Sequence, residues 1–222
     1  MSSVIPMPSS GGLTIDGSGV IFAVVQSGFG NRNEGLWCTA KLYDVRDAGA
    51  PFATFLIKMK EVKRVIEGVG LLESVAADLT VRSSEFGGND SVEISEGGTR
   101  MLIKGGAGVV VVVDAYSGDV LDVLVEHRGS AGGNGSAGRN GKADNERAIA
   151  CWAGGDEEYV LVGGEGGLDR DEGNDIYVYK VKEGLVGKWK EGAHAGGVRG
   201  IAVCRDYDLA ATTDQNTVLW RR

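Results

Sequence analysis

The sequence has few of the residues on which catalytic and metal sites most often depend. It contains two histidines and three cysteines. Cys38, Cys151 and Cys204 are far apart in the chain and form no CxxC pair, which argues against a disulfide framework and against a zinc site. We therefore expect three reduced thiols in a cytosolic or nuclear protein, with no metal and no cofactor.

Long apolar runs and basic clusters are also missing. The longest apolar run, 109–113, is far too short to span a membrane. Residues 1–10 have neither a basic start nor an apolar core, so no signal peptide is expected. The net charge is −8, and glutamates interrupt the densest basic run, at 58–64. This balance disfavours membrane contact and direct nucleic-acid binding, and it is compatible with basic partners such as histone tails.

Glycine, by contrast, is abundant. The 37 glycines among 222 residues disfavour helices, because each glycine costs roughly 1 kcal/mol in a helix interior. Many glycines suit short strands joined by tight turns. The apolar share of 42% is sufficient for a packed core, and the length fits one domain.

The apolar pattern predicts about four repeated units of short strands. Repeats of about 40 residues indicate propellers or solenoids, and four strands in a unit make the blade of a propeller. The first unit has strands at 13–15, 20–25, 40–44 and 53–56. The second has strands at 91–94, 100–103, 109–113 and 120–125. The third has strands at 146–150, 159–162, 176–179 and 185–189. The last has strands at 198–203, 209–213 and 217–220.

Three segments fall outside these units. Residues 1–10 are predicted to form an N-terminal tail, and 11–222 to form the array of blades. The first insert, 58–88, carries the apolar residues Met59, Val62, Val65, Ile66 and Val69 at helical spacing over 58–79. We predict a helix in a surface insertion there, whose apolar stripe serves the core rather than a partner. The second insert, 128–142, is a Gly/Ser/Asn-rich loop.

The last unit contains a specific constellation, His194, Thr212, Asp214 and Trp220. These residues have the spacing of the structural tetrad in WD40 repeats, in which the aspartate orients the imidazole, the imidazole the hydroxyl, and the hydroxyl the indole N–H. A complete buried network of this kind fixes the third strand against the outer turn. A catalytic His-Asp pair with Thr212 as nucleophile is the rival interpretation. It is disfavoured because no oxyanion or nucleophile-elbow motif accompanies the pair.

The other units are degenerate versions of this pattern. Tyr43-Asp44, Val113-Asp114 and Tyr179-Lys180 stand where a WD40 repeat has Trp-Asp, and none of these units has the turn histidine. Their assignment as repeats depends on the strand rhythm alone. The fold predicted from all four units is an all-β, WD40-type β-propeller.

Several segments resemble one branch of the WD40 family, the WD-repeat subunits of COMPASS-type histone methyltransferase complexes. The most specific segment is Lys-Leu-Tyr-Asp at 41–44 followed by Pro-Phe-Ala-Thr-Phe at 51–55. The resemblance extends over most of 11–56 and 91–127, and more loosely over 146–222. Members have about seven blades and this chain matches the last four, so the resemblance implies a partial ring that an additional segment or partner completes.

The resemblance also implies a function. Such subunits are nuclear, non-catalytic adaptors that join the methyltransferase to the phosphorylated C-terminal repeats of RNA polymerase. They also belong to phosphatase and transcription-termination complexes. Two alternatives remain open: a generic WD40 scaffold in ubiquitin ligation or trafficking, and a propeller enzyme, which would need carboxylates or metal ligands that converge on a central channel.

Overall fold

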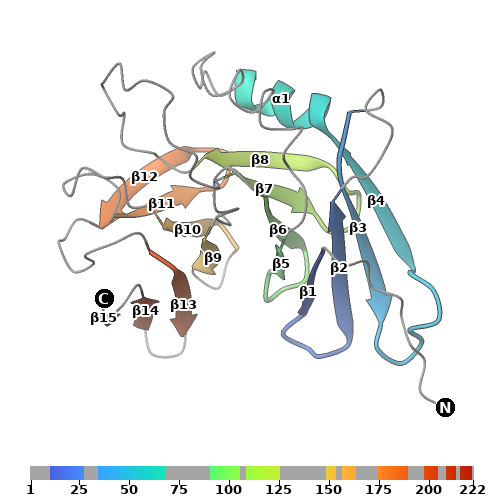
Figure 1. Ribbon diagram of the computed structural model, residues 1–222, viewed down its shortest axis with the longest axis horizontal. Coiled ribbons are helices and arrows are strands. Elements are labelled where there is room, and N and C mark those ends of the chain that lie inside the picture. The colour runs from blue at the N-terminus through green and yellow to red at the C-terminus, as the bar shows by residue number, and fades with distance from the viewer. Residues whose placement is uncertain are drawn as a thin grey trace, which may run out of the picture.

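The described residues form four antiparallel sheets that follow one another along the chain (Figure 1). The computed structural model describes residues 11–27, 35–68, 91–105, 109–125, 149–153, 157–163, 175–189, 198–204, 209–213 and 216–221. The predicted tail at 1–10, the 128–142 insert, and residues 69–88 of the first insert lie outside these ranges. The described part confirms an all-β fold with one short helix.

Each sheet is a meander in which consecutive strands pair. Sheet 1 contains β1 (Gly11–Ile15), β2 (Ile21–Ser27), β3 (Leu36–Asp44) and β4 (Ala53–Lys58). Sheet 2 contains β5 (Ser91–Ile94), β6 (Arg100–Lys104), β7 (Val109–Asp114) and β8 (Val120–Val125). Sheet 3 contains β9 (Ala150–Ala153), β10 (Tyr159–Gly163), β11 (Ile176–Lys180) and β12 (Gly184–Trp189). Sheet 4 contains β13 (Gly200–Cys204), β14 (Leu209–Thr213) and β15 (Thr217–Arg221).

The sheets stack face to face in an open array, with sheets 1 and 4 at its two ends (Figure 1). The first strand of each sheet contacts the sheet before it: β5 contacts β1 and β2, β9 contacts β6, and β13 contacts β9 and β10. We call the side of a sheet that is turned toward the preceding sheet its front face, and the opposite side its back face. In sheet 1 the front face is the side of Phe22 and Tyr43, and in sheet 4 the back face is the side of Ala202 and Leu219.

Stacking explains the run of five valines in β7. Val109, Val111 and Val113 pack in the core between sheets 1 and 2, whereas Val110 and Val112 pack in the core between sheets 2 and 3. All five side chains are almost completely buried. A strand covered on both faces needs apolar residues at every position, so its sequence shows no polar alternation.

The strand predicted at 40–44 begins four residues earlier, at Leu36. Burial on both faces explains a second misplaced strand. The prediction put the first strand of sheet 3 at 146–150, but the strand is β9, Ala150–Ala153. Ala150 and Trp152 face the core toward sheet 2, whereas Cys151 packs toward sheet 4. Since both sides of β9 are apolar, the period-2 signal that would have located it is absent.

The predicted helix is present as α1 (Met59–Gly68). It runs along the top of Figure 1 and contacts β8 and β4. Val62 and Ile66 are fully buried in the core between sheets 1 and 2, and Met59 and Val65 pack against the same core. The apolar stripe therefore has the core role that its spacing predicts; Val69 lies outside the described residues.

Candidate interaction surface

The predicted Trp-Asp positions are equivalent in the four sheets. Tyr43, Val113, Tyr179 and Trp220 are each the next-to-last residue of the third strand of their sheet. In sheets 2 to 4 this side chain packs toward the preceding sheet. Tyr43 occupies the same front position in sheet 1, where it stacks on Phe22 with ring centroids 4.9 Å apart. Equivalent positions in the third strands of consecutive sheets indicate a structural repeat, although the sequences of the units are only weakly similar.

The last sheet contains one contact of the predicted tetrad. Trp220 Nε1 donates a hydrogen bond of 2.7 Å to Thr212 Oγ1, and Thr212 is 1% exposed. His194 and Asp214 lie outside the described residues, so the complete tetrad stays a prediction.

The other three sheets have an aliphatic residue where sheet 4 has this threonine. Thr212 is two residues beyond the cross-strand neighbour of Trp220. The same step from the neighbours of Tyr43, Val113 and Tyr179 leads to Val24, Ile103 and Val162. An aliphatic side chain cannot accept an indole N–H bond. The hydrogen bond from Trp220 to Thr212 therefore has no counterpart at this position in the described parts of sheets 1 to 3, which agrees with the degenerate sequence of their units.

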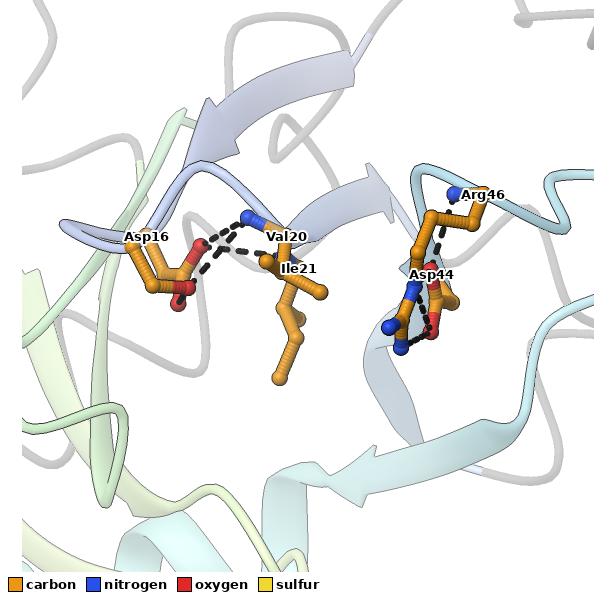
Figure 2. A network of polar contacts seen from close by, with 6 residues as sticks. Asp16, Val20, Ile21, Asp44 and Arg46 are labelled. Atoms are coloured by element: carbon orange, nitrogen blue, oxygen red, sulfur yellow. Dashed lines mark hydrogen bonds and ion pairs between the residues drawn. The ribbon is translucent and has the colours of Figure 1, made fainter.

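Asp44 and Asp114 close the turn that follows the third strand. Asp44 Oδ1 accepts from the backbone N–H of Arg46 at 2.8 Å, and its carboxylate forms an ion pair with that guanidinium at 2.5 Å (Figure 2). The hydrogen bond from the Arg46 side chain is the largest cause that lowers the pKa of Asp44 to about 2. Asp114 Oδ1 accepts from the N–H groups of Tyr116 and Ser117, each at 2.8 Å. Both aspartates thus terminate strands in Asx-type turns.

Asp16 stabilises the β1–β2 turn in a similar way. Its Oδ1 accepts from the N–H groups of Val20 at 3.0 Å and Ile21 at 2.9 Å, and its Oδ2 accepts from the Ser18 hydroxyl (Figure 2). Partial burial acts to raise the pKa of Asp16, but these hydrogen bonds outweigh it and the pKa is lowered. All three turn carboxylates accept hydrogen bonds from backbone N–H groups, so each stabilises its turn.

Hydrogen bonds connect the β9–β10 turn of sheet 3 to the β5–β6 hairpin of sheet 2. Glu157, in the β9–β10 turn, is buried and has a left-handed φ of 58°. Its carboxylate accepts from the Thr99 hydroxyl, and its backbone carbonyl accepts from the Arg100 guanidinium. Gly97 leaves room for this carboxylate, because a Cβ there would collide with Glu157 Oε1. Glu157, with its left-handed backbone, thus connects sheet 3 to sheet 2 through both its carboxylate and its backbone carbonyl.

Two further hydrogen bonds join sheets 2 and 3, one from the last strand of sheet 2 and one from its first strand. Buried Asp122 on β8 accepts from the backbone N–H of Lys182 at 2.7 Å. Glu93 on β5 forms an ion pair with Lys104 at 2.9 Å and accepts from the N–H of Trp152 on β9 at 3.2 Å. Sequence reasoning missed Asp122 and Glu157, since nothing local marks a carboxylate whose partner lies about 60 residues away.

The β3–β4 and β7–β8 turns carry exposed apolar side chains. Phe52 is 58% exposed and Tyr116 77% exposed. Phe55 packs on Gly118 of the β7–β8 turn, which brings the turn of Tyr116 against the strand that follows Phe52. Val45 in the β3–β4 turn is also exposed. We call Val45, Phe52 and Tyr116 the turn patch. Exposed aromatic side chains are the type that anchors protein interfaces.

Two other classes of site, metal centres and membrane spans, have requirements that the described residues can be held against. Among them no three histidine, cysteine, aspartate or glutamate side chains gather in a way that could hold a metal ion. No helix in the described ranges is long and apolar enough to cross a membrane. No known family model and no curated protein matches the chain.

Proposed function

We propose that the four sheets are consecutive blades of a WD40-type β-propeller, part of a ring of about seven, and that the protein is a non-catalytic scaffold. The observation that carries this proposal is the repeat of Tyr43, Val113, Tyr179 and Trp220 at one position of four successive third strands. Front-to-back packing of four meanders supports it, because propellers are built by radial repetition of such sheets.

The partners follow from the resemblance at 41–44 and 51–55. The chain is proposed to be a nuclear adaptor in a COMPASS-type histone lysine methyltransferase complex or in the related phosphatase and transcription-termination complex. Its partners are then methyltransferase subunits, a phosphatase scaffold and the phosphorylated repeats of RNA polymerase. Phe52 belongs to the resembling segment and to the turn patch, so the turn patch is the surface we propose for these contacts.

The test is an affinity pull-down of the tagged chain from nuclear extract, read by mass spectrometry. We expect the wild-type chain to recover methyltransferase or phosphatase subunits. The double variant Phe52→Ser, Tyr116→Ser should lose them while it keeps its circular dichroism spectrum, because both side chains are exposed. Val186→Ser is the matched control, since Val186 is a half-exposed apolar residue on sheet 3.

Other outcomes of the same experiment favour the alternatives. Recovery of ubiquitin-ligase or trafficking subunits would replace the chromatin assignment by a generic WD40 scaffold. Failure to recover any stable complex would overturn the adaptor function. A stoichiometric bound metal after purification would instead favour the propeller enzyme.

A further inference from the structure

The turn patch is surrounded by acidic turns that contain no lysine. The first and third turns of a meander close the same end of its sheet, and Gly17 of the β1–β2 turn lies against Glu96 of the β5–β6 turn, so these ends of sheets 1 and 2 adjoin. The four turns, 16–20, 44–52, 95–99 and 114–119, contain one basic residue, Arg46. They contain six acidic residues: Asp16, Asp44, Asp47, Glu96, Asp114 and Asp119.

The opposite end of sheet 1 has the opposite charge balance. α1 begins where β4 ends, six residues and about 20 Å from the β3–β4 turn. Residues 58–67, which include most of α1, contain four basic and two acidic residues. Figure 1 shows α1 at the top and the β1–β2 and β3–β4 turns at the bottom. The acidity of the turns is therefore a local feature and not an even share of the net charge.

The carboxylates next to the turn patch are not neutralised by neighbours. Arg46 already forms an ion pair with Asp44. Asp47 and Asp119 are exposed, and neither forms an ion pair with another residue that the structure describes. Asp47 follows Val45 by two residues, and Asp119 follows Tyr116 by three. Exposed apolar side chains beside uncompensated negative charges match a partner that combines an apolar residue with positive charges.

An unpaired hydrogen-bond acceptor also lies next to the turn of Tyr116. The backbone N–H of Ala115 donates to the carbonyl of Thr99 at 2.9 Å, and the Thr99 hydroxyl donates to the carboxylate of Glu157. The other carboxylate oxygen, Glu157 Oε1, is buried and has no hydrogen-bond partner. It lies against Gly97, which is exposed and has no side chain to cover it. A buried acceptor without a donor is destabilising, so this oxygen favours a ligand that brings N–H donors.

We propose that the turn patch binds a basic segment of a partner protein, an extended peptide in which lysine or arginine residues flank an apolar one. The apolar residue packs on Phe52 and Tyr116, and the basic residues lie beside Asp47 and Asp119. This inference rests on the proposed scaffold function and names the chemistry of its partner. Phosphate groups would be repelled by these carboxylates, so phosphorylated polymerase repeats would need a different surface of the protein.

Fluorescence anisotropy with synthetic peptides tests the charge preference directly. Three labelled peptides share a central leucine and carry lysine, glutamine or phosphoserine on both sides of it. The wild-type chain should bind the lysine peptide most tightly and the phosphoserine peptide least tightly. The preference should decrease as sodium chloride is added, because salt screens exposed charges.

Two double variants locate the binding site. Asp47→Asn with Asp119→Asn removes two charges beside the turn patch and should weaken binding of the lysine peptide by about three- to tenfold. Glu61→Gln with Glu67→Gln on α1 is the matched control, because it changes the net charge equally at the opposite end of sheet 1. The control should bind the lysine peptide as tightly as wild type, since its charges lie beyond the screening length from the turn patch.

Two results would overturn the basic partner. Equal binding of the three peptides would exclude a charge preference, and equal losses in the two double variants would show that net charge alone attracts the peptide. The scaffold function can fail separately, because a pull-down that recovers no complex leaves the peptide measurements unchanged. Conversely, a complex that Phe52→Ser, Tyr116→Ser loses but Asp47→Asn, Asp119→Asn retains would support the scaffold and contradict the basic partner.

Discussion

Replacement of Gly118 by alanine should destabilise the protein far more than the loss of a typical turn glycine. Gly118 has a φ of +78°, a left-handed conformation that costs an L-residue about 1–2 kcal/mol. An added Cβ would also lie 2.7 Å from Cγ and 3.0 Å from Cβ of Phe55. These atoms are next to the β4 backbone, so rotation of the ring cannot move them away.

The expected magnitude has two parts. Overpacking a filled site typically costs about 1–3 kcal/mol, in addition to the backbone strain. The strain is partly offset, by about 0.4–1 kcal/mol, because alanine reduces the conformational freedom of the unfolded chain. We therefore expect Gly118→Ala to lower the free energy of unfolding by about 2–4 kcal/mol.

Gly19 provides the matched control. Its φ is +72°, almost that of Gly118, but nothing lies within 4 Å of an added Cβ. Gly19→Ala should cost only about 1 kcal/mol, the strain without the collision. The difference between the two variants then isolates the contact between the turn of sheet 2 and β4 of sheet 1.

Urea unfolding followed by tryptophan fluorescence, at one fixed protein concentration, measures both effects. Phe55→Ala added to Gly118→Ala should recover part of the loss, because it removes the ring that the new methyl group meets. If Gly118→Ala and Gly19→Ala agree within about 0.5 kcal/mol, the β7–β8 turn does not make the contact with β4 that the structure describes.

Two further predictions concern polar contacts. Thr212→Val keeps the shape of the side chain but leaves the Trp220 indole N–H without its acceptor, so it should lower the free energy of unfolding by about 1–3 kcal/mol in the same urea assay. Thr212→Ser keeps the hydroxyl and should cost less. Equal stability of the Thr212→Val variant and wild type would contradict a stabilising hydrogen bond. The pKa of Asp44 is lowered from 3.8 to about 2, so its stabilising ion pair is present above about pH 4 and is lost as the pH falls toward 2. A carboxyl NMR titration should show the Asp44 midpoint near 2 in wild type and closer to 3.8 in Arg46→Ala, and a midpoint that does not move would exclude Arg46 as the cause.

The sequence was most informative where structure depends on neighbours along the chain. Period-2 alternation and glycine-rich turns predicted most strands within one or two residues, and helical spacing predicted α1. The contact between Thr212 and Trp220 was predicted from the spacing of the WD40 tetrad, and the register of the β14–β15 hairpin places the two residues on one face. Such features are encoded in segments of about ten residues, so no tertiary information is needed to see them.

Only the tertiary structure decided how the sheets meet. β9 was misplaced because burial on both faces removes the alternation that marks a strand. Glu157 and Asp122 gained their roles from partners about 60 residues away, and their own neighbours in the sequence are those of ordinary turn and strand residues. The different exposures of Leu13 and Val113 could not be read from the chain either, since both are apolar strand residues. One is exposed and the other buried solely because of which sheet stands beside it.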